Sequence, residues 1–227
     1  MKSGFDRLAR SYRALELLAF GRDLERARFA WLPALADRKS ILVLGEGDGR
    51  CLARLAALAP AARIHCVDSS PGMLARAQAR FSSGDGRRIQ FECADARAVV
   101  LPPGRYDAVV TLFFLDCFSD QDVRRLVARV GAALQPDSLW LFADFVLPEA
   151  GWRRWRARVW LGVLYFFFRW QTRLAVRELP PSETILAQAG WRPVRQREFQ
   201  AGLLRTVLLN QPGFSRSDGG ARPPGAL

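Results

Sequence analysis

The chain of 227 residues is half apolar, contains 11% aromatic residues and carries a formal net charge of +12. This length and composition suit one large domain with a single hydrophobic core, and they exclude an intrinsically disordered chain. The positive charge favours anionic partners, but it is almost entirely arginine, and a bias in base composition explains an arginine excess equally well.

Metal and disulfide frameworks are not expected. The cysteines at 51, 66, 93 and 117 form no CxxC pair, and residue 65 is the only histidine. A reducing, cytoplasmic setting fits this cysteine usage. The first 23 residues are interrupted by charges and lack the apolar core of a signal peptide. No segment reaches the roughly 20 apolar residues that a membrane-spanning helix needs.

The elements alternate along most of the chain. Apolar residues at helical spacing predict helices within 5–37. Short apolar runs then predict strands at 40–44, 63–67, 88–92, 106–112 and 138–146, and the amphipathic segments between them predict helices at 49–58, 71–81 and 120–133. Ser70 and Pro71 suit the cap and first turn of the helix at 71–81. This alternation indicates βαβ units and therefore a parallel sheet.

The pattern changes after residue 146. Residues 148–180 predict a long helical insert, followed by a helix at 182–189 and strands at 191–199 and 203–209. The last two strands are separated by only three residues, so they must form an antiparallel hairpin. We expect one domain over 1–210 and a disordered tail at 211–227.

The first strand runs into a glycine loop, "LGEGDGR". Gly45, Gly47 and Gly49 lie between a strand and a helix, where backbone N–H groups are available to a ligand. The dinucleotide fingerprint GxGxxG requires a glycine where Arg50 stands, and a P-loop requires Lys and Ser or Thr where Arg50 and Cys51 stand. Phosphate binding is therefore not favoured.

An acid follows at the end of the second strand. Asp68 lies at the carboxyl edge of the sheet, where ligands bind in doubly wound folds. A carboxylate there accepts hydrogen bonds from ribose hydroxyls, although a helix cap is the alternative. The combination of glycine loop, strand and acid favours ribose binding.

These segments resemble the motifs of class I S-adenosylmethionine-dependent methyltransferases, over roughly residues 5–210. "LGEGDGR" and "VDSSPGMLARA" are similar to the first two motifs, "FECADAR" to the third, and "YDAVVTLFFLDCF" and "LQPDSLWLF" to the fourth and fifth. The resemblance implies S-adenosylmethionine as the cofactor. It also implies an α/β, Rossmann-like sheet of seven mostly parallel strands with an antiparallel C-terminal hairpin, helices on both faces and an N-terminal helical cap.

The resemblance also implies a set of cofactor-binding residues. Asp95 is expected to bind the adenine amino group, and the acid that the family often has two residues before the first glycine is replaced by Val43. Glu46 is therefore a candidate partner for the methionine amino group, or else it only faces the positive end of the following helix. The full predicted set is Gly45, Glu46, Gly47, Gly49, Asp68, Ser69, Met73, Asp95 and Ala96.

Methyl transfer from a sulfonium needs alignment and exclusion of water more than acid–base catalysis. Asp116 lies at the carboxyl edge of the fourth strand, so it either orients or deprotonates an acceptor or bonds to the backbone there. Enzymes that methylate nucleic-acid bases have Asn or Asp, Pro, Pro and Tyr or Phe at this edge, and this chain has Phe114, Leu115 and Asp116. We therefore expect no nucleic-acid substrate.

The substrate is expected to be small and hydrophobic or amphipathic. "FDRLARSYRALE" resembles the cap of small-molecule members, which places Tyr12 either near the sulfonium or in the core. Residues 152–177 hold four tryptophans and seven arginines. They form a lid with Trp160, Tyr165 and Phe168 in the pocket, an interfacial helix at the inner membrane face, or a packed helix. Phe114 is a further pocket candidate.

The sequence thus predicts a methyltransferase of the branch that resembles quinone and phosphatidylethanolamine methyltransferases, with no metal. Two alternatives are kept: a nicotinamide-dependent oxidoreductase, and a non-catalytic nucleotide-binding module that holds membrane or RNA through the basic insert. The residues leave open the substrate, the acceptor atom and the oligomeric state.

Overall fold

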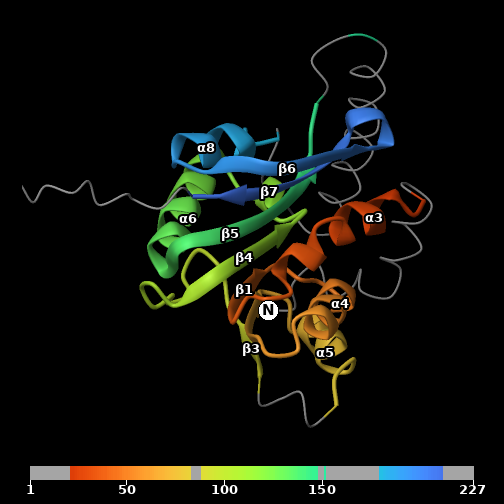
Figure 1. Cartoon of the computed structure of the whole chain (residues 1–227), viewed down its shortest axis with the longest axis vertical. Helices are drawn as coiled ribbons and strands as arrows, with labels where there is room; N and C mark the ends of the chain where they lie inside the picture. Colours follow the sequence, from red (N-terminus) through yellow and green to blue (C-terminus); the bar gives the residue numbers. More distant parts are fainter. Residues whose placement is uncertain (1–20, 83–87, 148–150, 152–178, 212–227) are drawn as a thin grey trace, which may run out of the picture.

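A computed structural model of the chain describes residues 21–82, 88–147, 151 and 179–211. Its centre is a seven-stranded sheet in the order β3-β2-β1-β4-β5-β7-β6 (Figure 1). The strands are β1 (Ser40–Leu44), β2 (Arg63–Asp68), β3 (Ile89–Cys93), β4 (Tyr106–Leu112), β5 (Leu134–Phe145), β6 (Arg192–Phe199) and β7 (Leu204–Asn210). The helices are α3 (Asp23–Phe29), α4 (Arg50–Leu58), α5 (Pro71–Gln78), α6 (Asp120–Ala133) and α8 (Ser182–Gln188), with short 3-10 turns η1 (Leu32–Leu35), η3 (Leu115–Cys117) and η4 (Gln200–Gly202).

The strand directions confirm the predicted topology. Strands β1 to β5 pair in parallel, and β7 runs antiparallel to both β5 and β6. The turn between β6 and β7 is η4, in which Ala201 has a left-handed backbone with φ 56°. The short loop therefore forms the antiparallel hairpin that its length requires.

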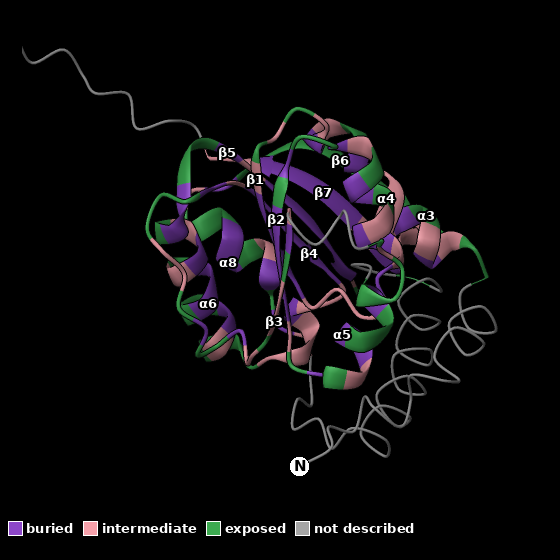
Figure 2. Cartoon of the chain, turned by 90° about the horizontal axis from the view of Figure 1, so that it is seen from below, coloured by how far each residue is buried: buried purple, intermediate pink, exposed green. Residues whose placement is uncertain are grey.

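Side-chain alternation along the strands divides the core between the two faces of the sheet. On β1, Leu42 and Leu44 pack into a cluster with α6 and α8, whereas Ile41 and Val43 pack into a cluster with α4 and α5. Figure 2 shows the sheet as the buried centre between these helices. Because successive side chains point to opposite faces, a fully buried parallel strand is apolar throughout.

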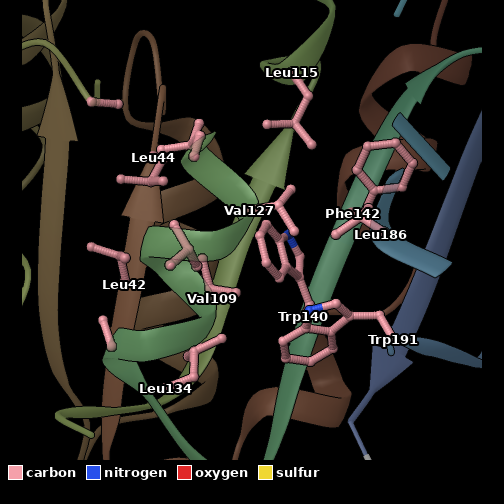
Figure 3. Close-up of a cluster of buried hydrophobic side chains, with 14 of the residues drawn as sticks. Leu42, Leu44, Val109, Leu115, Val127, Leu134, Trp140, Phe142, Leu186 and Trp191 are labelled. Atoms are coloured by element: carbon pink, nitrogen blue, oxygen red, sulfur yellow. The ribbon is translucent and has the colours of Figure 1, made fainter. Parts of the chain in front are cut away.

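The face under α6 and α8 is filled by large side chains (Figure 3). Trp140 of β5 meets Trp191, which precedes β6, edge to face at 5.2 Å between ring centroids. The indole N–H of Trp140 donates to the Thr111 hydroxyl at 2.8 Å, so this buried polar pair is satisfied. Even-numbered residues of β5 therefore face α6 and α8.

Two element ends differ from the sequence prediction by more than one residue. The helix expected at 71–81 ends at Gln78, and the strand expected to begin at residue 138 begins at Leu134. The extra residues of β5 are accommodated by a register shift against β4, where Tyr106 pairs with Leu134 but Ala108 pairs with Leu139. Pro136 is tolerated because it lies inside this irregularity.

Several predicted segments lie outside the described residues: the start of the cap at 5–20, almost all of the insert at 148–180, and nearly all of the tail at 211–227. The described part of the cap contains α3 and η1. Within the described part of the chain, no helix has the length and apolarity that crossing a membrane requires.

Candidate cofactor and acceptor site

The glycine loop joins β1 to α4 at the carboxyl edge of the sheet. Gly45, Gly47 and Gly49 all have positive φ, at 69°, 74° and 84°. A Cβ on Gly49 would lie 2.5 Å from the Cα of Ala77, so this glycine allows α4 to approach α5. A Cβ on Gly47 would meet nothing within 4 Å, so this position leaves open space beside the loop.

The carboxylate of Asp68 lies against this loop. It accepts the N–H of Gly47 at 3.1 Å and the N–H of Ser70 at 2.8 Å. The side chain of Ser70 in turn caps α5 by accepting the N–H of Met73 at 3.2 Å, which confirms the predicted cap. Asp68 therefore joins the ends of β1 and β2 at the place expected for a ribose.

The next acid, Asp95, follows the adjacent strand β3. Its carboxylate accepts the guanidinium of Arg97 at 2.6 Å, and this hydrogen bond lowers the pKa of Asp95. Met73 and Ala96 are buried, at 3% and 5% exposure, and supply apolar surface to this end of the site. The residues of the second and third motifs thus gather at neighbouring strand ends.

Arg129 of α6 holds the turn that contains Asp95. Its guanidinium donates to the carbonyl of Ala96 at 3.1 Å and also to the carbonyls of Arg97 and Val99. Charged donors on three carbonyls fix the backbone of a segment that forms no strand or helix. The sequence gives no local signal for this contact, because residues 97 and 129 are 32 positions apart.

Glu46 bends toward the start of α4. Its Oε1 accepts the N–H of Leu52 at 2.8 Å, in agreement with the second interpretation of this residue, a carboxyl at the positive end of the helix. Burial raises the pKa of Glu46 to about 8, while the Arg28 charge acts in the opposite direction. Glu46 is therefore a carboxyl that a nearby cation would ionise.

A cavity of about 50 Å³ adjoins the loop, lined by α3, the loop and the end of β4. Arg28 of α3 lines it, with its guanidinium 5.5 Å from the ring centroid of Phe113. Phe113 has φ 54°, a backbone conformation that non-glycine residues rarely adopt. This turn places Phe114 on the loop, where a Cβ on Gly45 would lie 2.0 Å from its ring.

Asp116 lies beyond these rings, in η3. It is next to a second buried acid, Asp144 of β5, whose carboxyl accepts the backbone N–H of Asp116. Burial raises the pKa of Asp116 to about 6 and raises the pKa of Asp144 strongly, and the proximity of Asp116 adds to the effect on Asp144. Two carboxyl groups that lie so near each other share one proton at neutral pH.

The donor set at strands β1 to β3 fits S-adenosylmethionine. The open face of Gly47 leaves room for the nucleoside, since a Cβ would fill it. Asp68 and Asp95 are the acceptors that ribose hydroxyls and an adenine amino group need, and the Glu46 carboxyl and Arg28 guanidinium suit an amino-acid zwitterion. This arrangement, in a sheet of this order, defines a nucleoside-binding α/β protein.

Comparison with known proteins identifies the family. A family model described as a methyltransferase domain matches residues 41–137. A demethylmenaquinone methyltransferase of Thermus thermophilus is 34% identical over 65% of this chain and 66% of its own length. One of Thermotoga maritima is 31% identical over 56% of each chain. The matched region thus spans less than two thirds of either relative.

Solved structures share the fold. A 1,6-didemethyltoxoflavin-N1-methyltransferase of Burkholderia thailandensis, with bound 1,6-didemethyltoxoflavin and S-adenosylhomocysteine, superposes with a TM-score of 0.62 at 19% identity, over 92% of this chain and 87% of that one. The mitomycin 7-O-methyltransferase MmcR gives 0.64 at 22% identity, over 91% and 60%. Residues 41–137 therefore contain a methyltransferase domain, the fold is that of class I S-adenosylmethionine-dependent methyltransferases, and S-adenosylmethionine is the cofactor that these matches indicate.

The structure brings together only part of the predicted site. The glycine loop, Asp68, Met73, Asp95 and Ala96 follow the carboxyl ends of the neighbouring strands β1, β2 and β3, and Ser69 lies there too but is exposed. Phe114 covers the glycine loop and is not among the residues that line a cavity on the acceptor side. Tyr12, Trp160, Tyr165 and Phe168 lie outside the described residues. In the described ranges, no group of three or more His, Cys, Asp or Glu could hold a metal ion.

Sequence reasoning missed two residues of the site, Arg28 and Asp144. Asp144 stands alone in the apolar run "WLFADFV" near the end of a strand. A single acid in such a run is costly to bury without a role, and this signal was available in the sequence. Arg28 has no such signal, because arginines are frequent throughout the chain.

Proposed function

We propose that this protein transfers the methyl group of S-adenosylmethionine to a small acceptor that carries an aromatic or quinonoid ring. The observation that carries the proposal is the position of Asp68. Its carboxylate joins the glycine loop and the end of β2 through two backbone N–H groups, beside the open face of Gly47. When bound, the cofactor supplies a methyl group already activated on a sulfonium.

Different residues of the chain would bind different parts of the cofactor. Asp68 accepts hydrogen bonds from the ribose, Asp95 binds the adenine amino group, and Met73 packs against the base. Glu46 and Arg28 hold the ammonium and carboxylate of the methionine part. Phe114 lies on the loop and must turn away to admit the ligand, because its ring fills the space above Gly45.

The acceptor class rests on the relatives. Two curated relatives are demethylmenaquinone methyltransferases, and a structural neighbour holds a small heteroaromatic acceptor. A ring acceptor also suits the aromatic side chains at the ends of β4 and β5, where Phe113 and Phe145 lie 5.1 Å apart. We therefore take demethylmenaquinone as the first compound to test.

Calorimetry with S-adenosylmethionine, S-adenosylhomocysteine and NAD tests the cofactor, and transfer of a labelled methyl group to demethylmenaquinone tests the acceptor. We expect both adenosyl ligands to bind and NAD not to bind. A preference for NAD would support the oxidoreductase alternative instead. Binding of liposomes or RNA without cofactor, together with no methyl transfer to any cell extract, would support the non-catalytic module.

A further inference from the structure

A second cavity lies at the end of β5, apart from the glycine loop. Its volume is about 260 Å³, and its walls come from the end of β5 and from residues 179–184, which lead into α8. This is just below the range of about 300–1,000 Å³ that is usual for small-molecule sites. A compound of one or two rings therefore suits it better than a long chain does.

The cavity contains polar groups that lack partners. Ser182 is 4% exposed, and its Oγ has no hydrogen-bond partner among the described residues. Glu183 binds Arg205 through Oε2 at 2.8 Å, but its Oε1 is buried and has no partner within the described part of the chain. Orphaned buried atoms of this kind are rare in folded proteins, so a small rearrangement of this wall around a ligand would supply their missing partners.

Asp144 lines the same cavity and is 3% exposed. Its Oδ1 accepts the N–H of Phe145 at 3.0 Å, and its carboxyl also accepts the backbone N–H of Asp116. As an even-numbered residue of β5, it shares the face of Phe142, which is packed under α6 and α8. Asp144 is therefore held at the floor of the cavity by two backbone donors.

Asp144 also connects the cavity to the cofactor side of the sheet. Asp116 interacts with both Asp144 and Arg28, and Arg28 lowers the pKa of Asp116 and lines the first cavity. The walls of the two cavities touch, because Phe113 lines the first, Phe145 lines the second, and their rings are 5.1 Å apart. An acceptor in the second cavity would thus lie beside the cofactor.

The charges around the carboxyl pair favour one shared proton. Arg28 faces Asp116 from α3, and the thiol of Cys117 donates to its Oδ1 at 3.5 Å. Glu183 faces Asp144 from α8 and raises its pKa, while Arg205 of β7 neutralises Glu183. The carboxyl pair therefore carries one net negative charge in a desolvated environment, which favours acceptance of a proton.

We propose that the second cavity binds a one- or two-ring acceptor through its hydroxyl group, that the carboxyl pair of Asp144 and Asp116 accepts the hydroxyl proton, and that Asp144 is the catalytic residue of the pair that contacts the hydroxyl. The inference rests on the proposed methyl transfer and adds the substrate class and the proton acceptor to it. Asp116, the candidate catalytic residue of the sequence analysis, then acts through its pairing with Asp144.

The step balances. The acceptor oxygen, or the ring carbon that it activates, forms a bond to the methyl carbon, and the bond between the methyl carbon and sulfur breaks. When the ring carbon is the nucleophile, the hydrogen on that carbon then moves to the acceptor oxygen, which restores the aromatic ring and its hydroxyl group. The electron pair of the broken bond goes to sulfur, which changes from a sulfonium to a neutral thioether. The acceptor proton goes to the carboxyl pair, which ends with two protons and no charge.

Binding of 1-naphthol to the full chain tests the cavity without any need for turnover. We expect saturable binding by the wild type, weakened about tenfold or more in Asp144→Asn, since a charged hydrogen bond is lost. Binding of 1-methoxynaphthalene, which has no proton to give, should change less than about threefold. The asparagine keeps the shape of the side chain, so the variant should fold.

Glu198→Gln is the matched control, because Glu198 is an exposed acid on the far side of Arg205 and does not line the cavity. It should bind 1-naphthol as the wild type does. Absence of saturable 1-naphthol binding, or equal binding by Asp144→Asn and the wild type, would overturn the cavity assignment. Infrared difference spectra should show a protonated carboxyl at neutral pH that is missing in Asp144→Asn, and its presence in the variant would overturn the shared proton.

Turnover tests the catalytic role and separates it from the proposed function. With a hydroxyl-bearing acceptor that the wild type methylates, Asp144→Asn should lose about 100-fold in kcat with an unchanged Kd for S-adenosylmethionine. Equal kcat values would overturn the role of Asp144 alone. Failure of the wild type to bind S-adenosylmethionine would instead overturn the proposed function, and the 1-naphthol result would still decide the cavity.

Discussion

The cofactor side and the acceptor side of the sheet are built differently. Over β1 to β3, each functional residue lies within a few positions of a strand end, and Asp68 binds the backbone of its own turn and of the neighbouring loop. Over β5 and α8, Asp144 and Ser182 are 38 positions apart and meet only in the folded chain. The proposed cofactor residues thus come from local motifs, and the proposed acceptor residues are brought together by tertiary contacts.

Substitution of Asp68 should distinguish cofactor binding from acceptor binding most clearly. Asp68→Asn is expected to weaken S-adenosylmethionine binding about 100-fold, because charged hydrogen bonds to the ribose and the anchor of the loop are lost. Binding of 1-naphthol should be unaffected. Calorimetry with both ligands measures the difference.

Asp107→Asn is the control for this change. The Asp107 carboxylate also holds two backbone donors, the N–H groups of Lys39 at 2.7 Å and Ser40 at 3.0 Å, but at the opposite edge of the sheet. It should lower stability without changing cofactor affinity. An equal loss of affinity in both variants would mean that Asp68 acts only through folding.

Two glycines of the loop should have different roles: Gly49 is needed for the structure, and Gly47 is needed for cofactor binding. Gly49→Ala is expected to cost about 3 kcal/mol of unfolding free energy, because its Cβ meets the backbone of α5 at a positive φ. Gly47→Ala has open space, so it should cost about 1–2 kcal/mol, from backbone strain alone. Urea denaturation measures both costs.

The two variants should rank in the opposite order for their loss of cofactor affinity, when the affinity is measured on folded protein. Gly47→Ala should weaken S-adenosylmethionine binding more than Gly49→Ala, because only the first methyl group enters the ligand space. The reverse order would contradict the placement of the nucleoside beside Gly47.

Arg129 joins the two sides, since α6 on one face of the sheet holds the turn of Asp95. Arg129→Met should lower stability by about 2 kcal/mol, because three backbone carbonyls, two of them in partly buried hydrogen bonds, lose a charged donor. Cofactor affinity should fall about fivefold as the turn loosens. Arg125→Met, in the same helix but exposed, is the control, and an equal effect of both variants on affinity would contradict a positioning role.

The smallest expected effect is on the pH dependence of binding. The Glu46 carboxyl, with its pKa raised to about 8 by burial, is neutral in the free protein below that pH. A bound ammonium group favours the carboxylate, so binding should release a proton and the affinity should rise with pH between about 6 and 8.

Glu46→Gln should remove this rise, and the difference between the two proteins cancels the titration of the ligand itself. The stability of the free protein should change with pH in the opposite direction to the affinity. Because the folded pKa is raised above the model-peptide value of 4.5, the free wild type should lose stability as the pH rises from about 4.5 to 8, and Glu46→Gln should not. Calorimetry and thermal denaturation across this range check both, and identical profiles for the two proteins would contradict the raised pKa.

The sequence predicted the fold well because its signals are local. Apolar runs of four to six residues between amphipathic helices indicate a buried parallel sheet, and the three-residue link Gln200–Gly202 permits only a hairpin. The ends of β5 were predicted less well, since the irregularity at Leu134 depends on its partner strand β4.

The site was predicted where its residues carry their own motif. Asp68 and Asp95 follow strand ends, and their placement is confirmed, although their contacts with a ligand remain predictions. The interpretation of Glu46 stayed open because its contact with Leu52 depends on the path of the loop. The single acid in the run "WLFADFV" marked Asp144 as unusual, but its pairing with Asp116 became visible only in the folded chain.

The sequence by itself determined the class of the protein, because hydrophobic periodicity, glycine spacing and acids at strand ends are set by the chain within a few residues. Only the tertiary structure decided which charges meet: Arg28 with Glu46 and Asp116, Asp116 with Asp144, and Glu183 with Arg205. The physical reason is that electrostatic interactions depend on distance and burial, and folding brings together residues from the glycine loop and from five elements, α3, η3, β5, α8 and β7.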